Sequence, residues 1–519
     1  MTSLILNPMF SIMSVFIILL WWILRSDGAR ILAIIPTPSF SHNTALQPLW
    51  RELSLRGHSV TLLTAEPIGD PQLVNLTEVD LSFSYKTMLK NLQEKIYTNR
   101  LEMYKFGYLR HAEVCDEQLG HPALQAIIRN ESEWFDLLIT ESSRLPVLAF
   151  AHRFRCPSIG VTVLDVYPTM HSLLGDPTHP LVYPDIWLGL GDCTSIVGRI
   201  RCVLYDLGTS LLQTRVLFPL YDQMIEKHFG EGYPPIGELV KGISIQFVNT
   251  DPVLHKVRPL VPGVIQVGGT LHRLSRDPLR QDLRSVLDKA TNGFIYFSLG
   301  SYAKSSSLPP KVLEVILETF AEIRYTVLWK FEDVLNKTEN VITLKWVPQV
   351  DVLGHPNIKL FITHGGLQSI NEAIHFGVPM VGMPIFADQQ QNVHLIVSRG
   401  CGLSANYRNL DRAGFEKTIN EVIDNSRYAT AIKTLRDRVR DQPMTGLERA
   451  VWWTEYVLRH KGAGHLKSGA VDVAFYQYYL LDVLTIVIAL FTLIIFGFYF
   501  VLASFFRIIR LSCYFLCKN

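Results

Sequence analysis

The sequence predicts an α/β protein made of two parallel-sheet lobes followed by a C-terminal transmembrane helix. Three observations lead to this prediction. Short apolar runs alternate with amphipathic stretches in two separate series, a polar segment divides the series, and an uncharged apolar run lies near the C-terminus. The length of 519 residues agrees with two lobes, because a chain of this size is too long for one hydrophobic core.

The N-terminal residues predict a secretory signal peptide over residues 1–29. An apolar run extends from Phe10 to Leu24, and the small residues after it suit cleavage near Gly28 or Ala29. No Lys or Arg precedes the run, so an uncleaved N-terminal anchor is the alternative interpretation.

A first alternating series predicts an N-terminal lobe over residues 30–267. The run ILAIIP (Ile31–Pro36), an amphipathic stretch and HSVTLLTA (His58–Ala65) together predict a βαβ unit of a parallel sheet. FDLLIT (Phe135–Thr140) and SIGVTVL (Ser158–Leu164) predict further buried strands. The first turn lacks G-x-G-x-x-G, which disfavours a dinucleotide-dependent oxidoreductase.

Two segments interrupt the alternation. Residues 167–187 are rich in Pro, Gly, His and aromatic side chains, and predict either a substrate-lining loop or plain connecting loops. Residues 268–293 are polar and rich in turn-forming residues, and predict an interdomain linker. The second series follows with GFIYFSLGS, TVLWKF, IKLFITHGG and VPMVGMPIF, and predicts a C-terminal lobe over residues 294–465.

The apolar run near the C-terminus predicts a single membrane span over residues 483–506. Its 24 residues carry no charge and suffice to cross a bilayer as one helix. The tail, residues 507–519, contains basic residues and no acid, so it is expected in the cytosol and the body in a lumen. Three Asn-x-Ser/Thr triplets agree with this compartment and are candidate glycosylation sites: Asn75, Asn130 and Asn336.

The charge balance excludes one class of partner. The chain has 49 basic and 47 acidic residues, which gives no basic footprint for a nucleic acid. No Cys or His spacing indicates a metal cage. The composition leaves open whether the chain is a monomer or a homo-oligomer.

The strongest functional signal is WVPQVDVLGHPNIKLFITHGGLQSINEA, which begins at Trp346. Within it a buried strand, IKLFIT, is followed by His364, Gly365 and Gly366 and then by a helix that closes at Gly377. A parallel strand delivers its carboxyl end to the ligand crevice, and the unpaired amides of a helix N-terminus attract anions. This segment therefore predicts a phosphate-binding turn, where glycine lets the backbone approach the ligand closely.

Side chains beside this turn predict the rest of a nucleotide site. Gln368 and Glu372 are four residues apart, so they share one helix face. A carboxylate there repels phosphate but accepts hydrogen bonds from sugar hydroxyls. Trp346 offers a flat face to a base and Gln349 an amide to its edge. Together these groups predict a site for a nucleotide diphosphate.

This joint spacing resembles the signature of the UDP-glycosyltransferase family, whose members have the GT-B fold of two Rossmann-like lobes. The match continues through GVPMVGMPIFADQQQNV (Gly377–Val393) and includes GFIYFSLGS. The resemblance covers essentially the whole chain, and both ends are most similar to insect enzymes, whose usual donor is UDP-glucose.

The resemblance implies ten donor-binding residues. These are Ser301, Trp346, Gln349, His364, Gly365, Gly366, Gln368, Glu372, Asp388 and Gln389. Trp346 would stack on uracil, Gln349 would contact its edge, and Glu372 would hold the ribose hydroxyls. Many family members carry Asn where this chain has Gln368, whose amide reaches further.

The remaining implied roles concern the diphosphate and the sugar. His364 and the amide of Gly365 would hold the diphosphate, and Ser301 falls where the family meets it. Asp388 and Gln389 would bind the sugar. The helix terminus and His364 would supply the counter-charge of the diphosphate, so no metal and no cofactor are implied.

The resemblance also implies a general base for the acceptor. Family members use a His on the first loop, which is His42 in SFSHNTALQ. An imidazole titrates near neutral pH and works best when an acid orients its other nitrogen. Vertebrate relatives supply an Asp at the position of Glu141, so the partner is either Glu141 or absent, with Asp136 the next candidate.

The expected function follows from these roles. The protein would be an endoplasmic-reticulum enzyme of detoxification, anchored in the lipid bilayer, that moves glucose from UDP-glucose to a small lipophilic acceptor hydroxyl with inversion. UDP-glucose would be a co-substrate. The alternative from another class is a membrane-tethered protein that binds a nucleotide sugar or small ligand without turnover, and the departure at Glu141 is its only support.

Overall fold

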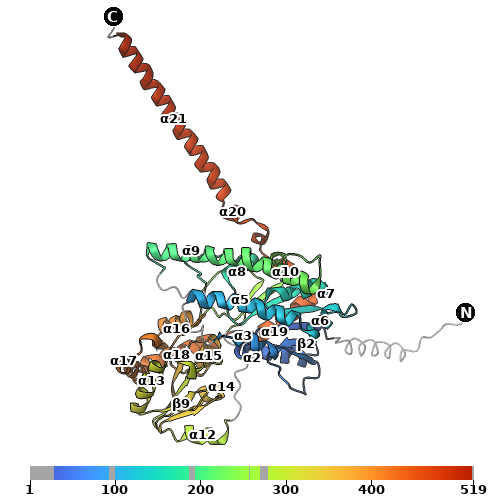
Figure 1. The fold of residues 1–519 in the computed structure, drawn as a ribbon, viewed down its shortest axis with the longest axis vertical. Coiled ribbons are helices and arrows are strands. Elements are labelled where there is room, and N and C mark those ends of the chain that lie inside the picture. The colour runs from blue at the N-terminus through green and yellow to red at the C-terminus, as the bar shows by residue number, and fades with distance from the viewer. Residues whose placement is uncertain (1–27, 93–99, 186–192, 256, 269–278, 517–519) are drawn as a thin grey trace, which may run out of the picture. The chain divides into compact units, whose positions relative to one another are not determined.

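The computed structural model describes residues 28–516 except 93–99, 186–192, 256 and 269–278. The predicted signal peptide lies almost wholly outside the described residues. The chain forms two compact units, one ending at Lys467 and one beginning at Ser468. The first unit contains two lobes, each built on its own parallel sheet (Figure 1).

The first lobe is built on a seven-stranded parallel sheet in the order β3-β2-β1-β4-β5-β6-β7. Its strands are β1 (Arg30–Ile35), β2 (Ser59–Thr64), β3 (Leu76–Asp80), β4 (Leu137–Glu141), β5 (Ser158–Thr162), β6 (Ile245–Val248) and β7 (Val264–Gln266). Ile31 and Ala33 of β1 join the core on one face of the sheet, whereas Leu32 and Ile34 join the core on the other. Both faces are covered, which explains the unbroken apolar run in the sequence.

Helices cover both faces of this first sheet. They are α2 (Phe40–Leu55), α3 (Tyr85–Leu89), α5 (Arg100–Leu119), α6 (Pro122–Arg129), α7 (Ala149–Phe154), α8 (Pro168–Leu174), α9 (Ile196–Leu212), α10 (Phe218–Phe229) and α11 (Ile236–Lys241). A π-helical segment, η3 (Gln213–Leu217), joins α9 to α10. The described part of the predicted loop region 167–187 therefore includes a helix, α8.

The second lobe has a six-stranded parallel sheet in the order β10-β9-β8-β11-β12-β13. Its strands are β8 (Phe294–Ser298), β9 (Thr326–Lys330), β10 (Val341–Leu344), β11 (Ile358–Thr363), β12 (Met380–Gly382) and β13 (Gly402–Ser404). Its helices are α12 (Gln281–Asp288), α13 (Pro310–Glu322), α14 (Gln349–Leu353), α15 (Leu367–Phe376), α16 (Gln389–Ser398), α17 (Arg412–Asp424) and α18 (Ser426–Arg440).

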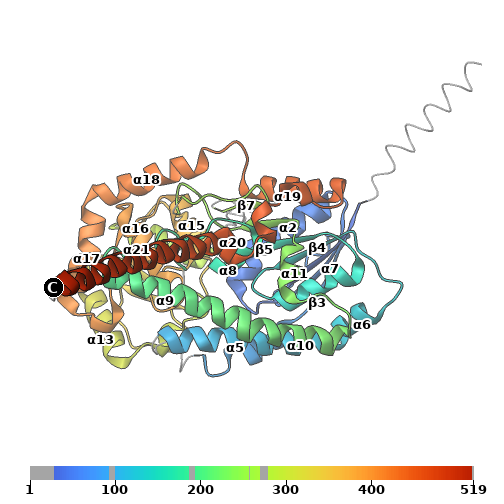
Figure 2. The same cartoon turned by 90° about the horizontal axis from the view of Figure 1, so that it is seen from above.

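The lobe boundaries differ from the predicted ranges at two helices. Helix α12 lies within the predicted linker 268–293, yet its Leu283 and Leu287 are buried in the core of the second lobe. Helix α19 (Gly446–His460) lies within the predicted C-terminal lobe, yet Ala450 and Val451 pack in the core of the first sheet. Figures 1 and 2 both show α19 beside α2. The chain thus returns to the first lobe before its last segment.

The second unit is a tail with one long helix. Helix α21 (Leu481–Leu516) includes the predicted span 483–506 and continues through most of the predicted tail. It is long and apolar enough to cross a membrane, with a mean hydropathy of 2.8 over its most apolar window. A short helix, α20 (Phe475–Tyr478), precedes it.

Candidate active site

A cavity of about 510 Å³ is lined by residues of both lobes. The strands of each sheet are parallel, so their carboxyl ends lie along one edge, and it is these ends and the loops after them that line the cavity. Every predicted catalytic or donor-binding residue except Gly365 lines it: His42, Glu141, Ser301, Trp346, Gln349, His364, Gly366, Gln368, Glu372, Asp388 and Gln389.

On the first-lobe side, the structure brings His42 and Glu141 together. β4 pairs directly with β1, so Glu141 at the end of β4 lies beside the loop that leads from β1 into α2. The Nδ1 atom of His42 is 2.9 Å from Oε1 of Glu141. Thr37 on the same loop donates a hydrogen bond to Oε2. The Glu141 side chain is 1 % exposed and that of His42 is 27 % exposed, so the imidazole is the more accessible of the two groups.

The Glu141 carboxylate is held in its ionised form. Burial raises its pKa, but the hydrogen bond from His42, the charges of His42 and Arg144, and the Thr37 hydroxyl together outweigh burial and lower the pKa to about 2. Asp136, the alternative partner, precedes β4 and accepts a hydrogen bond from the Arg30 amide at the opposite end of the strand. Asp136 is therefore excluded as the partner of His42.

On the second-lobe side, the imidazole of His364 lies between two glycines. A Cβ atom at Gly366 would lie 2.7 Å from Nε2 of His364, and one at Gly300 would lie 2.6 Å from its Cε1. Glycine at these positions thus makes room for the His364 ring. Gly365 has a φ of 89°, and its amide donates to Oγ1 of Thr363 rather than into the cavity. The role of the Gly365 amide in holding diphosphate stays a prediction, and in this structure Thr363 accepts its hydrogen bond.

The positive charge near this turn belongs to a residue that the sequence analysis missed. Burial, aided by the charge of Lys330, lowers the pKa of His364 to about 4, so His364 is neutral near neutral pH. It therefore cannot supply the expected counter-charge in this state. Lys330, the last residue of β9, lines the cavity and forms a 2.8 Å ion pair with Glu332. The sequence did contain a signal for this residue. In TVLWKF a lysine ends an apolar strand, and the carboxyl ends of parallel strands face the ligand.

Gln349 and Glu372 form one hydrogen-bonded group. Nε2 of Gln349 donates to Oε2 of Glu372 at 2.7 Å and to Oγ of Ser369 at 3.0 Å, while Oε1 accepts from the Tyr296 hydroxyl at 3.2 Å. Burial raises the pKa of Glu372 to about 7, although the bond from Gln349 opposes the shift. Both amide hydrogens of Gln349 are engaged. A contact with the edge of a base would therefore use the second lone pair of its Oε1 atom.

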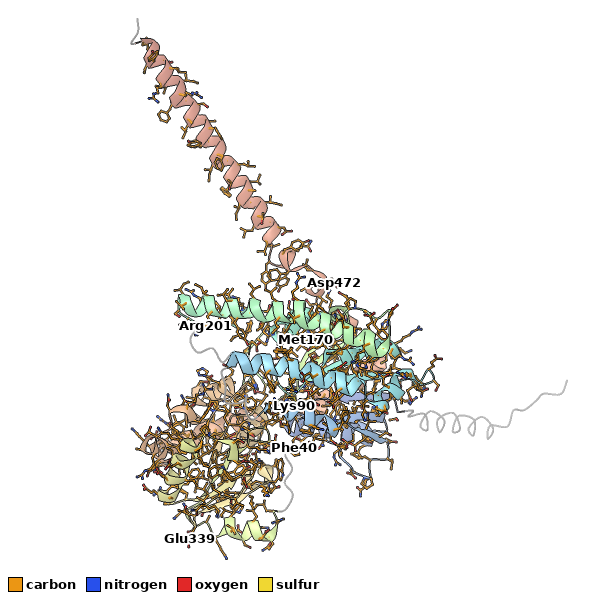
Figure 3. All side chains as sticks on the ribbon, in the orientation of Figure 1. Phe40, Lys90, Met170, Arg201, Glu339 and Asp472 are labelled. Carbon is orange, nitrogen blue, oxygen red and sulfur yellow. A yellow bond between two sulfur atoms is a disulfide. The ribbon has the colours of Figure 1, made fainter. Side chains whose placement is uncertain are left out.

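Contacts between the lobes involve two of the predicted residues. The Trp346 ring meets the Phe40 ring edge to face, with centroids 4.7 Å apart, and stays 54 % exposed. Phe40 begins α2 of the first lobe and lies where the two lobes meet (Figure 3). Nε2 of Gln368 donates to the carbonyl of Val163 at 3.2 Å. The long Gln side chain thus binds the opposite lobe here, whereas a donor contact was expected.

Asp388 and Gln389 lie in a tight turn after β12. Ala387 has a φ of 55°, a conformation uncommon for a residue with a side chain. Gln389 stabilises the turn, because its Oε1 accepts from the amides of Ile385 and Phe386. Burial raises the pKa of Asp388, although the bond from Asn392 and a charge on His42 oppose the shift. Asp388 and His42 line the same cavity.

The three predicted glycosylation sites are exposed. Asn75 lies in the turn before β3, Asn130 is the C-cap of α6, and Asn336 lies between β9 and β10. Each side chain is therefore at the surface, as carbohydrate attachment requires.

The fold and the cavity define the class of protein. Two parallel α/β lobes that share one cavity, with a His–Glu pair from one lobe and a helix N-terminus from the other, form a GT-B glycosyltransferase. A solved structure titled "Crystal structure of TcCGT1 in complex with UDP" matches with a TM-score of 0.56 and 15% identity, over 84% of this chain and 100% of that one.

The sequence comparisons give the family. The model described as "UDP-glucoronosyl and UDP-glucosyl transferase" matches residues 30–513. Two proteins of Dactylopius coccus are similar to the chain: "UDP-glycosyltransferase UGT5" is 33% identical over 88% of this chain and 89% of its own length, and "UDP-glucosyltransferase 2" is 32% identical over 90% and 91%. The chain belongs to the UDP-glycosyltransferase family, and it is an enzyme that transfers a sugar from a UDP-sugar.

Proposed function

We propose that the protein transfers glucose from UDP-glucose to a hydroxyl group of a small lipophilic acceptor, with inversion at the anomeric carbon. The observation that carries this proposal is the 2.9 Å contact between His42 and Glu141 in a cavity that also contains the donor-side residues. The same contact removes the only support for a binding protein without turnover, which was the absence of an Asp at the position of Glu141.

The acceptor side provides general-base catalysis. With Nδ1 of His42 held by Glu141, Nε2 is the nitrogen that takes the proton of the acceptor hydroxyl. The acceptor oxygen then forms a bond to the anomeric carbon as the bond from that carbon to the diphosphate oxygen breaks. Attack opposite the leaving group inverts the configuration. The ionised Glu141 stabilises the imidazolium that forms.

The donor side binds the nucleotide and stabilises the leaving group. Lys330 and the amides at the N-terminus of α15 provide positive potential for the diphosphate, while His364 contributes a neutral hydrogen-bonding ring. Glu372 would bind ribose hydroxyls and Trp346 the base. Asp388, which lines the same cavity as His42, would bind a sugar hydroxyl. No metal or other cofactor is part of this proposal.

The choice of glucose is tested with the purified full-length chain. The relative "UDP-glucosyltransferase 2" supports glucose, whereas the family also includes glucuronosyl transferases. UDP release is measured with UDP-glucose and with UDP-glucuronate, each with a panel of phenols and lipophilic alcohols. We expect turnover with UDP-glucose and a β-linked product from its α-linked donor. Preference for UDP-glucuronate would contradict the donor, and UDP binding without turnover of any acceptor would contradict catalysis.

We further propose that the enzyme is a glycoprotein of the endoplasmic reticulum with a role in detoxification, anchored by α21, with its body in the lumen. The exposed Asn75, Asn130 and Asn336 support a lumenal body. The disulfide between Cys193 and Cys202 supports it too, since such bonds persist in oxidising compartments. Arg507 and Arg510 after the apolar run support a cytosolic C-terminus.

A further inference from the structure

Helix α9 and the segment η3 expose a stripe of large apolar side chains. The α9–η3 stripe consists of Ile196, Val197, Ile200, Val203, Leu204, Leu207, Leu211 and Val216, which are 47–73 % exposed. They recur every three or four residues and so lie along one side of the helix. The buried side of α9 carries small or polar residues instead, namely Gly198, Cys202 and Thr209, while η3 buries Gln213 and Leu217.

This pattern is the reverse of that of an ordinary helix on a soluble lobe, whose apolar side faces the core. Both views show α9 along the outside of the first lobe (Figures 1 and 2). A contiguous apolar surface of this extent indicates an interaction site with a protein or a membrane. Arg199, Arg201 and Arg215 are exposed on the same helical segment, with Arg201 labelled in Figure 3. An apolar stripe accompanied by arginines is typical of helices that lie in the interface of a lipid bilayer.

We propose that the α9–η3 stripe docks on the surface of the lipid bilayer that holds α21. This inference rests on the membrane anchoring in the proposed function. Two features of the chain indicate that the bilayer is what covers the α9–η3 stripe. Only thirteen residues, 468–480, connect the first unit to α21, so the body is tethered within about 45 Å of the span. Exposed aromatic residues at the end of this tether, Phe475, Tyr476, Tyr478 and Tyr479, are typical of the interface.

Docking would deliver acceptors to the cavity. α9 packs on α8, and α8 begins directly after Tyr167, which lines the cavity. A bilayer against α9 therefore lies next to the acceptor side of the site. A lipophilic acceptor that partitions into the membrane would enter from there. The UDP-sugar is water-soluble and would not depend on docking.

The test separates the tether from the docking surface. The full-length protein, with a protease recognition sequence inserted beside Asp472, is reconstituted in vesicles of about four parts phosphatidylcholine to one part phosphatidylserine. Cleavage then frees the outward-facing bodies from α21, and the vesicles are floated. We expect the cleaved wild-type body to float with the vesicles. In Leu204→Glu/Leu207→Glu the floating fraction should fall roughly tenfold or more, because two charges enter the apolar stripe.

A matched control places the same charges elsewhere. Leu55→Glu/Val334→Glu changes two apolar residues that are 69 % and 94 % exposed outside the stripe, and should float like the wild type. Turnover of a water-soluble phenol shows that each variant is folded and reports on the proposed function separately. The stripe variant should raise KM severalfold for a lipophilic acceptor while KM for UDP-glucose stays unchanged.

Two results would overturn the inference. The first is complete release of the wild-type body on cleavage. The second is flotation of the cleaved body with protein-bearing vesicles but not with added protein-free vesicles, which would identify a second copy of the chain as the occupant. Both measurements need only the wild-type protein with its cleavable tether, so they stand even if a stripe variant fails to fold.

Discussion

Glu141 is the residue that most clearly defines the acceptor side of the cavity. It is buried, it ends a strand next to β1, and it accepts hydrogen bonds from His42 and Thr37. A buried carboxylate of this kind is stable only with such partners, and they hold its pKa at about 2. Its ionised form orients the imidazole and favours the protonated His42 that forms during transfer.

The first prediction concerns this pair. His42→Ala should lower kcat roughly 10²–10⁴-fold while UDP still binds, because the general base is lost and the donor residues remain. Glu141→Gln should also lower kcat substantially. The double variant should be no slower than His42→Ala, because the two residues act as one unit. Steady-state kinetics with UDP binding by calorimetry measure this, and additive losses would contradict the pair.

The second prediction concerns the pH dependence of UDP-glucose binding through Glu372. Its pKa is raised to about 7 by burial, and only the ionised form is a strong acceptor for ribose hydroxyls. Affinity for UDP-glucose, whose diphosphate has no group that titrates in this range, should therefore rise as pH increases towards 7 and level off above it. In Glu372→Gln the affinity should be roughly ten- to a hundredfold weaker and this rise should be absent. Calorimetric titrations between about pH 5.5 and 8.5 measure it, and an unchanged pH profile in the variant would refute the assignment.

The third prediction concerns Lys330, the cation that the sequence analysis missed. Lys330→Gln should weaken UDP binding roughly tenfold, because a charge-assisted contact to the diphosphate is lost. The exposed Lys311→Gln is the matched control and should bind UDP like the wild type. Affinity for uridine, which has no phosphate, should not change in either variant. Equal losses for UDP and uridine would indicate a structural role for Lys330 instead.

At the level of elements, the phosphate-binding turn depends on the space around His364. The fourth prediction is that Gly366→Ala weakens UDP binding roughly tenfold, because the added Cβ would approach Nε2 of His364 to 2.7 Å and displace the ring. Gly366 has a φ of −62°, so no backbone strain accompanies the change. Gly464→Ala is the control, since its Cβ would meet nothing within 4 Å. Wild-type UDP affinity in Gly366→Ala would show that the ring position is unimportant.

The elements that the sequence could predict are those whose pattern is local. The strands that were found have long apolar runs, because a strand covered on both faces needs such a run. β6, which is buried along its whole length but interrupted by Gln246, was not predicted. The βαβ order then led to parallel sheets and to the cavity at their carboxyl ends. α19 was assigned to the wrong lobe by position, since its amphipathic pattern does not say which sheet it covers. Contacts between segments that are far apart in the sequence cannot be predicted from the local periodicity of either segment.

Within the candidate site, too, local patterns could be predicted from the sequence and contacts between distant segments could not. Motif spacing found Gln349 and Glu372, the family resemblance supplied His42 and Glu141, and the structure gathers these residues in one cavity. Spacing could not show that Gln368 reaches the Val163 carbonyl of the other lobe, because that bond depends on how the lobes meet. It also could not give the neutral state of His364, which follows from burial and from Lys330.

At the level of the whole molecule, the two lobes are held together around the cavity by contacts from both sides. Tyr302 donates a hydrogen bond to the Pro38 carbonyl, Gln368 donates to Val163, and Trp346 packs against Phe40. The return of α19 to the first lobe adds a further connection, with Arg449 donating to the Gln266 carbonyl at 2.7 Å. The residues that bind the sugar donor, from the second lobe, and the residues on the acceptor side, from the first lobe, are thus kept at one site.

The fifth prediction concerns the orientation of this molecule in the membrane. If α21 spans the bilayer with its basic end in the cytosol, protease added to intact microsomes should remove an epitope tag placed after Asn519 but spare a tag inserted beside exposed Gly464. Detergent should expose both tags. A glycosidase should shift the mobility of the wild type, whereas replacement of Asn75, Asn130 and Asn336 by Gln should abolish the shift, since lumenal exposure of the body is what permits their modification. Digestion of the body tag without detergent, together with a wild type that the glycosidase leaves unchanged, would reverse the proposed orientation and place the active site in the cytosol.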